Sequence, residues 1–304
     1  MSAEPAAPAP GAGLKGDAVL FVVTAFWGLT FVTVKDALAD ADPFSFLVLR
    51  FGVGAIAATV IAGRRIFEPA NLRAGLTLSG FLFLGYALQT WGLELTTPSR
   101  SAFITGLAVV LVPLVSTALF RRWPKVPSVV GVVLAVLGLW LLTGGAVPGS
   151  PSTRTGDLLT LGCAVSYAFH ITLTEKMAPG RSVAAMVAVQ LWVVALASAA
   201  CLPFVHVRVA WTGGLVGAVL FCGLFASAVA ISVQMWAQAR TTAVRAALIY
   251  SLEPVFAVGY SVAAGRERLG GRELAGGAII IAGVLVAEVG AALLDRWRRR
   301  AVTV

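Results

Sequence analysis

Long apolar runs, separated by short polar or Gly/Pro-rich breaks, dominate the pattern of this chain. A run of about 20 mostly apolar residues can cross a bilayer as a helix. The pattern predicts ten such helices, which cover Asp17–Val34, Pro43–Ala62, Ala74–Leu95, Ser101–Phe120, Val126–Gly145, Gly156–Thr174, Val183–Phe204, Gly213–Trp236, Ala243–Ala264 and Leu274–Leu294.

Helices are favoured over a membrane β-barrel by the length and the uniformity of these runs. Barrel strands alternate apolar and polar residues over about 10 positions, whereas these runs are longer and apolar on all sides. Since backbone groups in hydrocarbon must form their hydrogen bonds internally, we predict an all-α integral membrane protein.

Composition supports the same class. Of the 304 residues, 59% are hydrophobic and 12% are charged, whereas soluble domains average about 45–50% and about 25%. The net charge is +9, but the basic residues stand in short clusters between the apolar runs, as in loops that face anionic lipid. We therefore predict membrane lipid as a partner, and no nucleic acid.

The distribution of Lys and Arg predicts the orientation, because cytoplasmic loops are enriched in these residues. With the N-terminus inside, 15 of the 23 basic residues fall on inside segments, 7 on outside segments and Arg50 within a span. The cluster Arg266, Arg268 and Arg272 is the one discordant loop. We predict a multi-pass protein of the cell inner membrane with both termini in the cytoplasm.

The two halves of the chain repeat one another. The stretches that start at Gln89 and Gln234 read QTWGLELTTPSRSAFITGLAVVLVP and QMWAQARTTAVRAALIYSLEP. A shift of 145 residues aligns Gln89 with Gln234, Trp91 with Trp236 and Arg100 with Arg245, and a shift of 140 aligns Gly16-Asp17 with Gly156-Asp157.

Each half holds five predicted helices, so the second half enters the membrane from the opposite face. Inverted repeats of this kind are a recurrent plan of secondary transporters, which bind their substrate near the midplane between the repeats. The predicted organisation is a disordered tail at 1–13, two five-helix repeats at 14–145 and 146–295, and a basic cytoplasmic tail at 296–304.

Five stretches resemble the EamA-type family of the drug/metabolite transporter superfamily. They are AFWGLTFVTVK (Ala25–Lys35), LRFGVGAI (Leu49–Ile56), SRSAFITGLAVVLVPL (Ser99–Leu114), RAALIYSLEPVFA (Arg245–Ala257) and GGRELAGGAIIIAGVLV (Gly270–Val286). The resemblance implies a ten-helix carrier with a central substrate cavity, lined largely by its first, third, fourth, sixth, eighth and ninth helices.

Aromatic and polar residues of the first and sixth helices are candidates for substrate binding. Tyr167 and His170 lie three residues apart on one helix face, and Trp27 and Thr30 take the same places in the first helix. Aromatic side chains here can instead fill space between the halves. His170 can titrate during transport or act as a neutral hydrogen-bonding group between helices, the interpretation we favour.

Amides and a proline-flanked acid supply the other candidates. Gln89 and Gln234 can bind a polar or zwitterionic solute, with interhelical hydrogen bonding as the rival role. Glu253 precedes Pro254, which should kink the ninth helix and free the carbonyl of Tyr250, a further candidate for substrate binding. The carboxyl can bind a cationic group or a proton, or hold the kink by a hydrogen bond; we favour the kink. Pro113 should bend the fourth helix in the same way.

Three arginines are assigned structural or charge roles. Arg50 lies about 10 Å into the second helix, where a charge costs about 2.5–3.5 kcal/mol, so we favour a structural tether over a substrate ligand. Arg100 and Arg245 begin the fourth and ninth helices, and we favour contact with lipid headgroups over steering of anions.

The predicted function is secondary active transport of small polar metabolites, such as amino acids, by alternating access and in the direction of export, with proton coupling as an open hypothesis. An intramembrane enzyme is the first alternative, although no G-x-S-x-G or H-E-x-x-H motif occurs. A membrane scaffold that binds a lipid or a protein is the second. No cofactor or metal is predicted, because Cys163, Cys201 and Cys222 lie singly in apolar runs.

Overall fold

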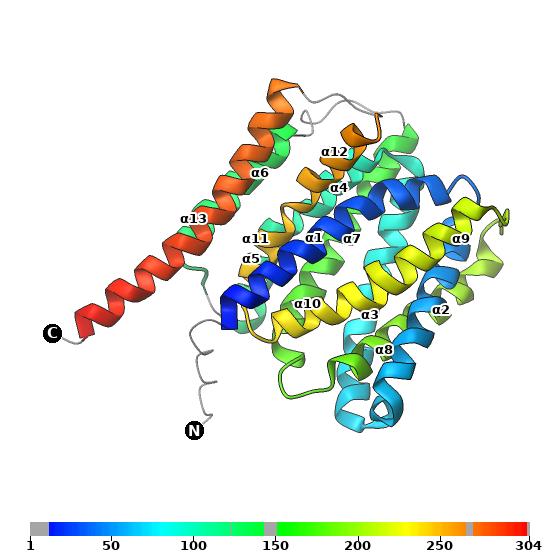
Figure 1. The fold of residues 1–304 in the computed structure, drawn as a ribbon, viewed down its shortest axis with the longest axis horizontal. Coiled ribbons are helices and arrows are strands. Elements are labelled where there is room, and N and C mark those ends of the chain that lie inside the picture. The colour runs from blue at the N-terminus through cyan, green and yellow to red at the C-terminus, as the bar shows by residue number, and fades with distance from the viewer. Residues whose placement is uncertain (1–11, 122, 143–150, 266–269, 303–304) are drawn as a thin grey trace.

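The structure is a computed structural model that describes residues 12–121, 123–142, 151–265 and 270–302. Figure 1 shows a bundle of long helices, and the described residues contain no strand apart from an isolated bridge between Ala41 and Val209. The predicted disordered tail lies almost wholly outside the described residues, as does the loop between the two halves.

Within the described residues, the first half contains five helical segments. They are α1 (Ala12–Ala37), α2 (Pro43–Ala62) with a 3-10 turn (Gly63–Phe67), α3 (Pro69–Leu95), the broken pair α4 (Pro98–Gly106) and α5 (Ala108–Phe120), and α6 (Val126–Leu142).

The second half contains five more. They are α7 (Pro151–Met177), α8 (Val183–Cys201) with a 3-10 turn (Leu202–Phe204), the continuous α9 (Gly213–Leu220), π-helix η3 (Phe221–Val229) and α10 (Ala230–Gln238), the broken pair α11 (Ala243–Tyr250) and α12 (Glu253–Ala263), and α13 (Gly271–Val302). The predicted all-α membrane class is confirmed, and six of these segments are long and apolar enough to cross a membrane.

Local sequence explains where the helices begin. Asp42 caps α2 by accepting hydrogen bonds from the amides of Phe44 and Ser45, and the following proline needs no N–H partner. Thr97 and Thr242 cap α4 and α11 through the amides three residues on, those of Arg100 and Arg245. These caps set the register of the two arginines on their helices.

Both halves break one helix at the same position of the repeat. α11 ends at Tyr250, and α12 restarts at Glu253 with Pro254 in its first turn. The break in the first half lies at Leu107, which is 145 residues before Leu252. Pro113, which is predicted to bend this helix, lies inside α5, six residues beyond the break. The helix is interrupted earlier because the Leu107 amide bonds to the Ile104 carbonyl in a tightened turn.

Equivalent helices of the two halves run in opposite directions. Asp17, near the start of α1, pairs with Arg245 of α11, while Glu175, near the end of α7, accepts a hydrogen bond from the amide of Ala243 in α11. The start of α1 and the end of α7 therefore lie at the same end of the bundle (Figure 1). The two repeats are inverted relative to one another.

Contacts between the halves follow a pseudo-two-fold pattern. A Cβ added at Gly131 of α6 would lie 2.6 Å from the Gly283 carbonyl oxygen of α13, and one added at Gly138 would lie 2.7 Å from that of Gly276. The 145-residue shift exchanges these two contacts. Glycine is required at this crossing because the two backbones touch, and Figure 1 shows α6 and α13 side by side at one edge of the bundle.

Candidate functional site

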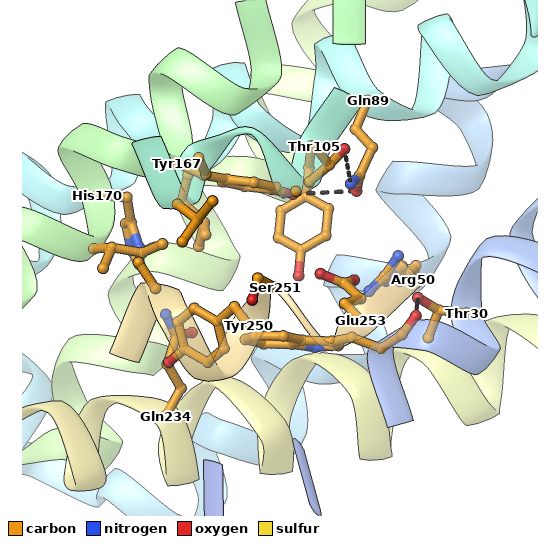
Figure 2. A pocket seen from close by; sticks show the side chains of 18 residues that line it. Thr30, Arg50, Gln89, Thr105, Tyr167, His170, Gln234, Tyr250, Ser251 and Glu253 are labelled. Atoms are coloured by element: carbon orange, nitrogen blue, oxygen red, sulfur yellow. Dashed lines mark hydrogen bonds between the residues drawn. The ribbon is translucent and has the colours of Figure 1, made fainter. Parts of the chain in front are cut away.

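A cavity lies between the halves, next to both helix breaks. The space not filled by atoms, which includes the opening to the outside, is about 690 Å³. Elements of both repeats line it, including α1, α2, α3, α4, α7, α10 and α11 (Figure 2).

All of the residues proposed from sequence for substrate binding line this cavity: Trp27, Thr30, Gln89, Tyr167, His170, Gln234, Tyr250 and Glu253. The structure brings them together, and their part in binding stays a prediction. Reasoning from sequence missed Tyr86, Thr105 and Ser251, which also line the cavity. Tyr86 lies three residues before Gln89 on α3, so helical spacing could have indicated it.

A hydrogen-bonded chain of side chains forms one wall of the cavity. The hydroxyl of Tyr167 donates to Oε1 of Gln89 at 3.2 Å, and Nε2 of Gln89 lies 3.2 Å from the hydroxyl oxygen of Thr105 (Figure 2). Tyr86 stands edge-on to Tyr167, with ring centroids 5.6 Å apart. This wall links α3, α4 and α7 and offers amide and hydroxyl groups to a polar solute.

The opposite wall is built on the second half. Nε2 of Gln234 donates to Gln238 at 3.0 Å, and Gln238 in turn donates to the Ile171 carbonyl of α7. Tyr250 packs edge-on against Trp27, with ring centroids 5.5 Å apart. The repeat-related amides Gln89 and Gln234 therefore face the cavity from different walls (Figure 2).

The π-helix positions Trp27 and Arg50. Nε1 of Trp27 donates to the carbonyl of Ala226 at 3.0 Å, and Nε of Arg50 donates to the hydroxyl of Ser227 at 2.9 Å. Both acceptors lie within η3 (Phe221–Val229). The Ala226 carbonyl oxygen has two lone pairs, so it can accept from the indole in addition to any helical hydrogen bond.

His170 is held as a neutral interhelical group would be. It is 1% exposed, and its Nε2 lies 2.7 Å from Oε1 of Gln190 in α8. This geometry agrees with the favoured interpretation of a hydrogen bond between helices. The histidine still borders the cavity, on the side away from Arg50 and Glu253 (Figure 2).

Arg50 is buried, but its two terminal nitrogens, Nη1 and Nη2, form no hydrogen bond within the described residues. The residue is 3% exposed, Ser227 holds Nε, and its Cζ lies 4.8 Å from the Tyr86 ring centroid and 5.1 Å from that of Phe51. Within the described residues, Nη1 and Nη2 have no hydrogen-bond or ion-pair partner. Arg50 is therefore tethered, as the sequence suggested, and also presents free donors to the cavity.

Glu253 lies in the first turn of α12, where the helix dipole favours a negative charge. Its carboxyl forms no hydrogen bond or ion pair with the described part of the chain. The favoured role of a hydrogen bond that holds the kink is therefore wrong; Pro254 and the tight turn at Ser251 account for the break. Figure 2 shows the carboxyl and the Arg50 guanidinium on the same side of the cavity.

Arg100 and Arg245 lie outside the cavity lining, and each forms an ion pair. Nη2 of Arg100 lies 2.6 Å from Oδ2 of Asp157, and Arg245 pairs with Asp17. These contacts replace the favoured interpretation that both side chains reach lipid headgroups, because each helix start faces the other half of the protein.

The sequence profile of the EamA-like transporter family matches this chain twice, at residues 14–144 and 154–288. The chain belongs to the EamA-like transporter family. It is a multi-pass membrane transporter, with a small molecule as its substrate, and not an enzyme.

Individual relatives agree with this assignment. An uncharacterized transporter of Archaeoglobus fulgidus is 30% identical over 279 residues, covering 90% of this chain and 86% of the relative. A probable amino-acid metabolite efflux pump of Escherichia coli is 25% identical over 181 residues, covering 59% of each chain. A solved crystal structure is similar in fold, with a TM-score of 0.78 over 93% of this chain and 22% identity.

Proposed function

We propose that this EamA-family transporter is a secondary carrier that exports small zwitterionic metabolites of the amino-acid type across the inner membrane. The cavity is exposed alternately to the two sides, and both termini lie in the cytoplasm. The direction of export is supported by two relatives that are named probable amino-acid metabolite efflux pumps. The orientation is supported by the distribution of basic residues.

One observation carries the choice of substrate. A buried guanidinium and a carboxyl, from opposite halves, border the same cavity without pairing with each other. An unpaired charge within a membrane span costs about 2.5–3.5 kcal/mol on insertion scales. A solute that carries both a carboxylate and an ammonium group would satisfy both residues at once and add no net charge.

The geometry assigns the two ends of such a solute. The free Nη atoms of Arg50 can form charge-assisted hydrogen bonds with a carboxylate. Glu253 can accept from an ammonium group, with the aromatic rings of Trp27, Tyr86 and Tyr250 nearby for cation–π contact. Gln89 and Gln234 supply further donors and acceptors.

The test compares three matched solutes in proteoliposomes: an amino acid, its amide, which lacks the carboxylate, and its deaminated acid, which lacks the amine. The wild type should prefer the amino acid. Arg50→Gln should lower amino-acid flux about tenfold or more, the effect of losing a charge-assisted bond, and leave flux of the amide unchanged. Glu253→Gln should instead remove the preference for the amino acid over its deaminated acid.

Arg240→Gln is the matched control for Arg50→Gln. Its guanidinium also lies over an aromatic ring, that of Trp236 at 4.3 Å, but it is exposed and outside the cavity lining. Flux should be unaffected. Equal losses for all three solutes in Arg50→Gln would contradict the assigned role of the arginine.

The wider cavity lining is tested by Tyr167→Ala and Gln234→Ala. Both should lower amino-acid flux severalfold while the protein still inserts, because each removes a polar group that faces the solute. Val60→Ala serves as control, since Val60 is 79% exposed on α2. Wild-type flux in both cavity variants would exclude this cavity as the site.

Proton coupling is tested on the same carboxyl. If Glu253 exchanges a proton for the ammonium group, a pH gradient should drive accumulation in the wild type and should have no effect on Glu253→Gln. Dependence on the gradient that survives in Glu253→Gln would exclude this carboxyl as the proton carrier.

A further inference from the structure

Among the described residues, two close ion pairs join the halves of the protein, besides a longer contact of 3.9 Å between Arg208 and Glu94. Arg100 of α4 holds Asp157 of α7 through Nε, 2.9 Å from both carboxylate oxygens, and through Nη2, 2.6 Å from Oδ2. Arg245 of α11 holds Asp17 of α1 through Nη2. Each pair therefore takes its arginine from one repeat and its aspartate from the other.

The two pairs are equivalents under exchange of the halves. The 145-residue shift that relates the repeats converts Arg100 into Arg245, and the 140-residue shift converts Asp17 into Asp157. The threonine caps Thr97 and Thr242 fix both arginines in the first turn of their helices.

The pairs lie at opposite ends of the bundle, which we name the Asp17 end and the Asp157 end. α1 carries Asp17 near its start and Lys35 near its other terminus. Nζ of Lys35 donates to the carbonyls of Leu93, Glu94 and Thr96, and Thr96 donates to Asp157. One helix, α1, therefore reaches from one ion pair to the other.

Each end has a second contact of the same kind. At the Asp157 end, a Cβ added at Gly92 would lie 2.7 Å from the Gly156 carbonyl oxygen, so the two backbones touch. At the Asp17 end, a Cβ added at Gly16 would lie 3.8 Å from the Ala237 carbonyl oxygen of the other half, an ordinary contact, and Glu175 accepts a hydrogen bond from the Ala243 amide within the second half. Glu175 is the 140-residue equivalent of Lys35. In this structure both ends are thus fastened between the halves, with the cavity between them.

We propose that the Arg100–Asp157 and Arg245–Asp17 pairs are the two closing contacts of the transport cycle, one at each end of the cavity. The proposal rests on alternating access, as proposed above. To admit a solute from one side, the halves must separate at that end and the local pair must break. Separation also admits water, which solvates the freed charges and makes a broken pair inexpensive there, unlike a broken pair in hydrocarbon.

The opposite pair remains formed in each open state, so the two pairs alternate. Removing one pair should therefore favour the state that is open at its own end. Because the pairs are equivalents, Arg100→Gln and Arg245→Gln are matched variants that must act in opposite directions. A contact that serves only to stabilise the fold would not produce this opposition.

The test measures access to a reporter cysteine in the cavity, Ala108→Cys, since Ala108 lines the cavity and is 9% exposed. Right-side-out and inside-out membrane vesicles are treated with a membrane-impermeant maleimide, and labelling of the protein without the reporter is subtracted. Arg100→Gln should raise labelling about fivefold or more from one side and lower it from the other. Arg245→Gln should show the reverse. The double variant R100D/D157R exchanges the two charges and can re-form the pair. Its labelling should return toward that of the reporter protein with the native Arg100–Asp157 pair.

Shifts in the same direction, or no shift in variants that melt like the wild type, would overturn the proposal. If the glutamine variants do not fold, Arg100→Lys and Arg245→Lys keep the charge but lose the bidentate geometry. The two lysine variants should shift the labelling in opposite directions and by less than the glutamine variants. Absence of these labelling shifts would also overturn the proposal. Opposite shifts in a protein that carries no tested solute would support these closing contacts and refute only the transport of those solutes.

Discussion

At the scale of single residues, the cavity is distinguished by two ionisable groups that lie on it without an ion-pair partner among the described residues. Arg50 is anchored by Ser227 and two aromatic rings, and its outer nitrogens are left toward the cavity. Glu253 is placed by the break before α12 and has no partner among the described residues. Since burying an unpaired ionisable group is costly, both residues fit the proposed zwitterionic solute, which would pair with each of them.

Asp42 shows the opposite arrangement, because its carboxylate accepts hydrogen bonds from the backbone amides of Phe44, Ser45 and Arg208. Partial burial acts to raise its pKa, but hydrogen bonds from the backbone of Arg208 and from Ser45 and Phe44 outweigh this effect, so the pKa lies below its usual value. A carboxyl with a depressed pKa stabilises the fold above its unfolded pKa of about 3.9, and this stability is lost as the pH falls through the folded pKa.

Asp42→Ala should therefore destabilise the protein at pH 7 by about 1–2 kcal/mol, the cost of losing a helix cap. The difference from the wild type should shrink when melting in detergent is repeated below pH 4. Asp40→Ala is the control at pH 7. Within the described part of the chain, the Asp40 carboxyl accepts one hydrogen bond, an exposed one from the Thr212 hydroxyl. A difference that stays constant down to pH 2 would contradict the role of the ionised cap.

At the scale of elements, the breaks in the two repeat-related helix pairs, α4–α5 and α11–α12, shape the cavity. The break at Ser251–Leu252 turns Glu253 into a first-turn residue, and the break at Leu107 follows two cavity residues, Thr105 and Gly106. Close packing holds the second break in place: a Cβ added at Gly28 of α1 would lie 2.9 Å from the Glu253 carbonyl oxygen and 2.6 Å from Cβ of Phe256.

Gly28→Ala should therefore force α1 away from α12, lower the stability by about 1–3 kcal/mol and reduce solute flux. Gly52→Ala is the matched control in α2, because a Cβ there meets no atom within 4 Å. It should leave stability unchanged or raise it by up to about 1 kcal/mol through helix propensity. Equal melting temperatures for the two variants would show that the α1–α12 contact has no effect on stability.

The helices were predictable from sequence, whereas the exact sites of interruption were less so. Apolar runs and caps identify helices because these properties are local. The break at Leu107 was missed because no proline at that position marks it, and the turn depends on the hydrogen bond from the Leu107 amide to the Ile104 carbonyl in the folded chain. The π-helix at Phe221–Val229 carries no comparable signal in the apolar run that contains it.

At the scale of the whole molecule, the repeat allowed most of the site to be predicted. Gln89 and Gln234, or Trp27 and Tyr167, are unremarkable alone, but their equivalence under the 145-residue and 140-residue shifts indicated a shared cavity, and they line one. The partners of Arg100 and Arg245 were missed, although the shifts that align Asp17 with Asp157 were visible in the sequence. Pairing between halves is a long-range contact, which a shift within the sequence does not reveal by itself.

The most direct measurement of the central claim is counterflow in proteoliposomes that contain the purified wild type. Vesicles are loaded with unlabelled amino acid and diluted into a trace of the labelled compound. A carrier whose single cavity alternates between the two sides should accumulate label transiently above its equilibrium level, and the label should be recovered chemically unchanged. Monotonic equilibration without this transient excess, or a label that has been converted to another compound, would contradict the account.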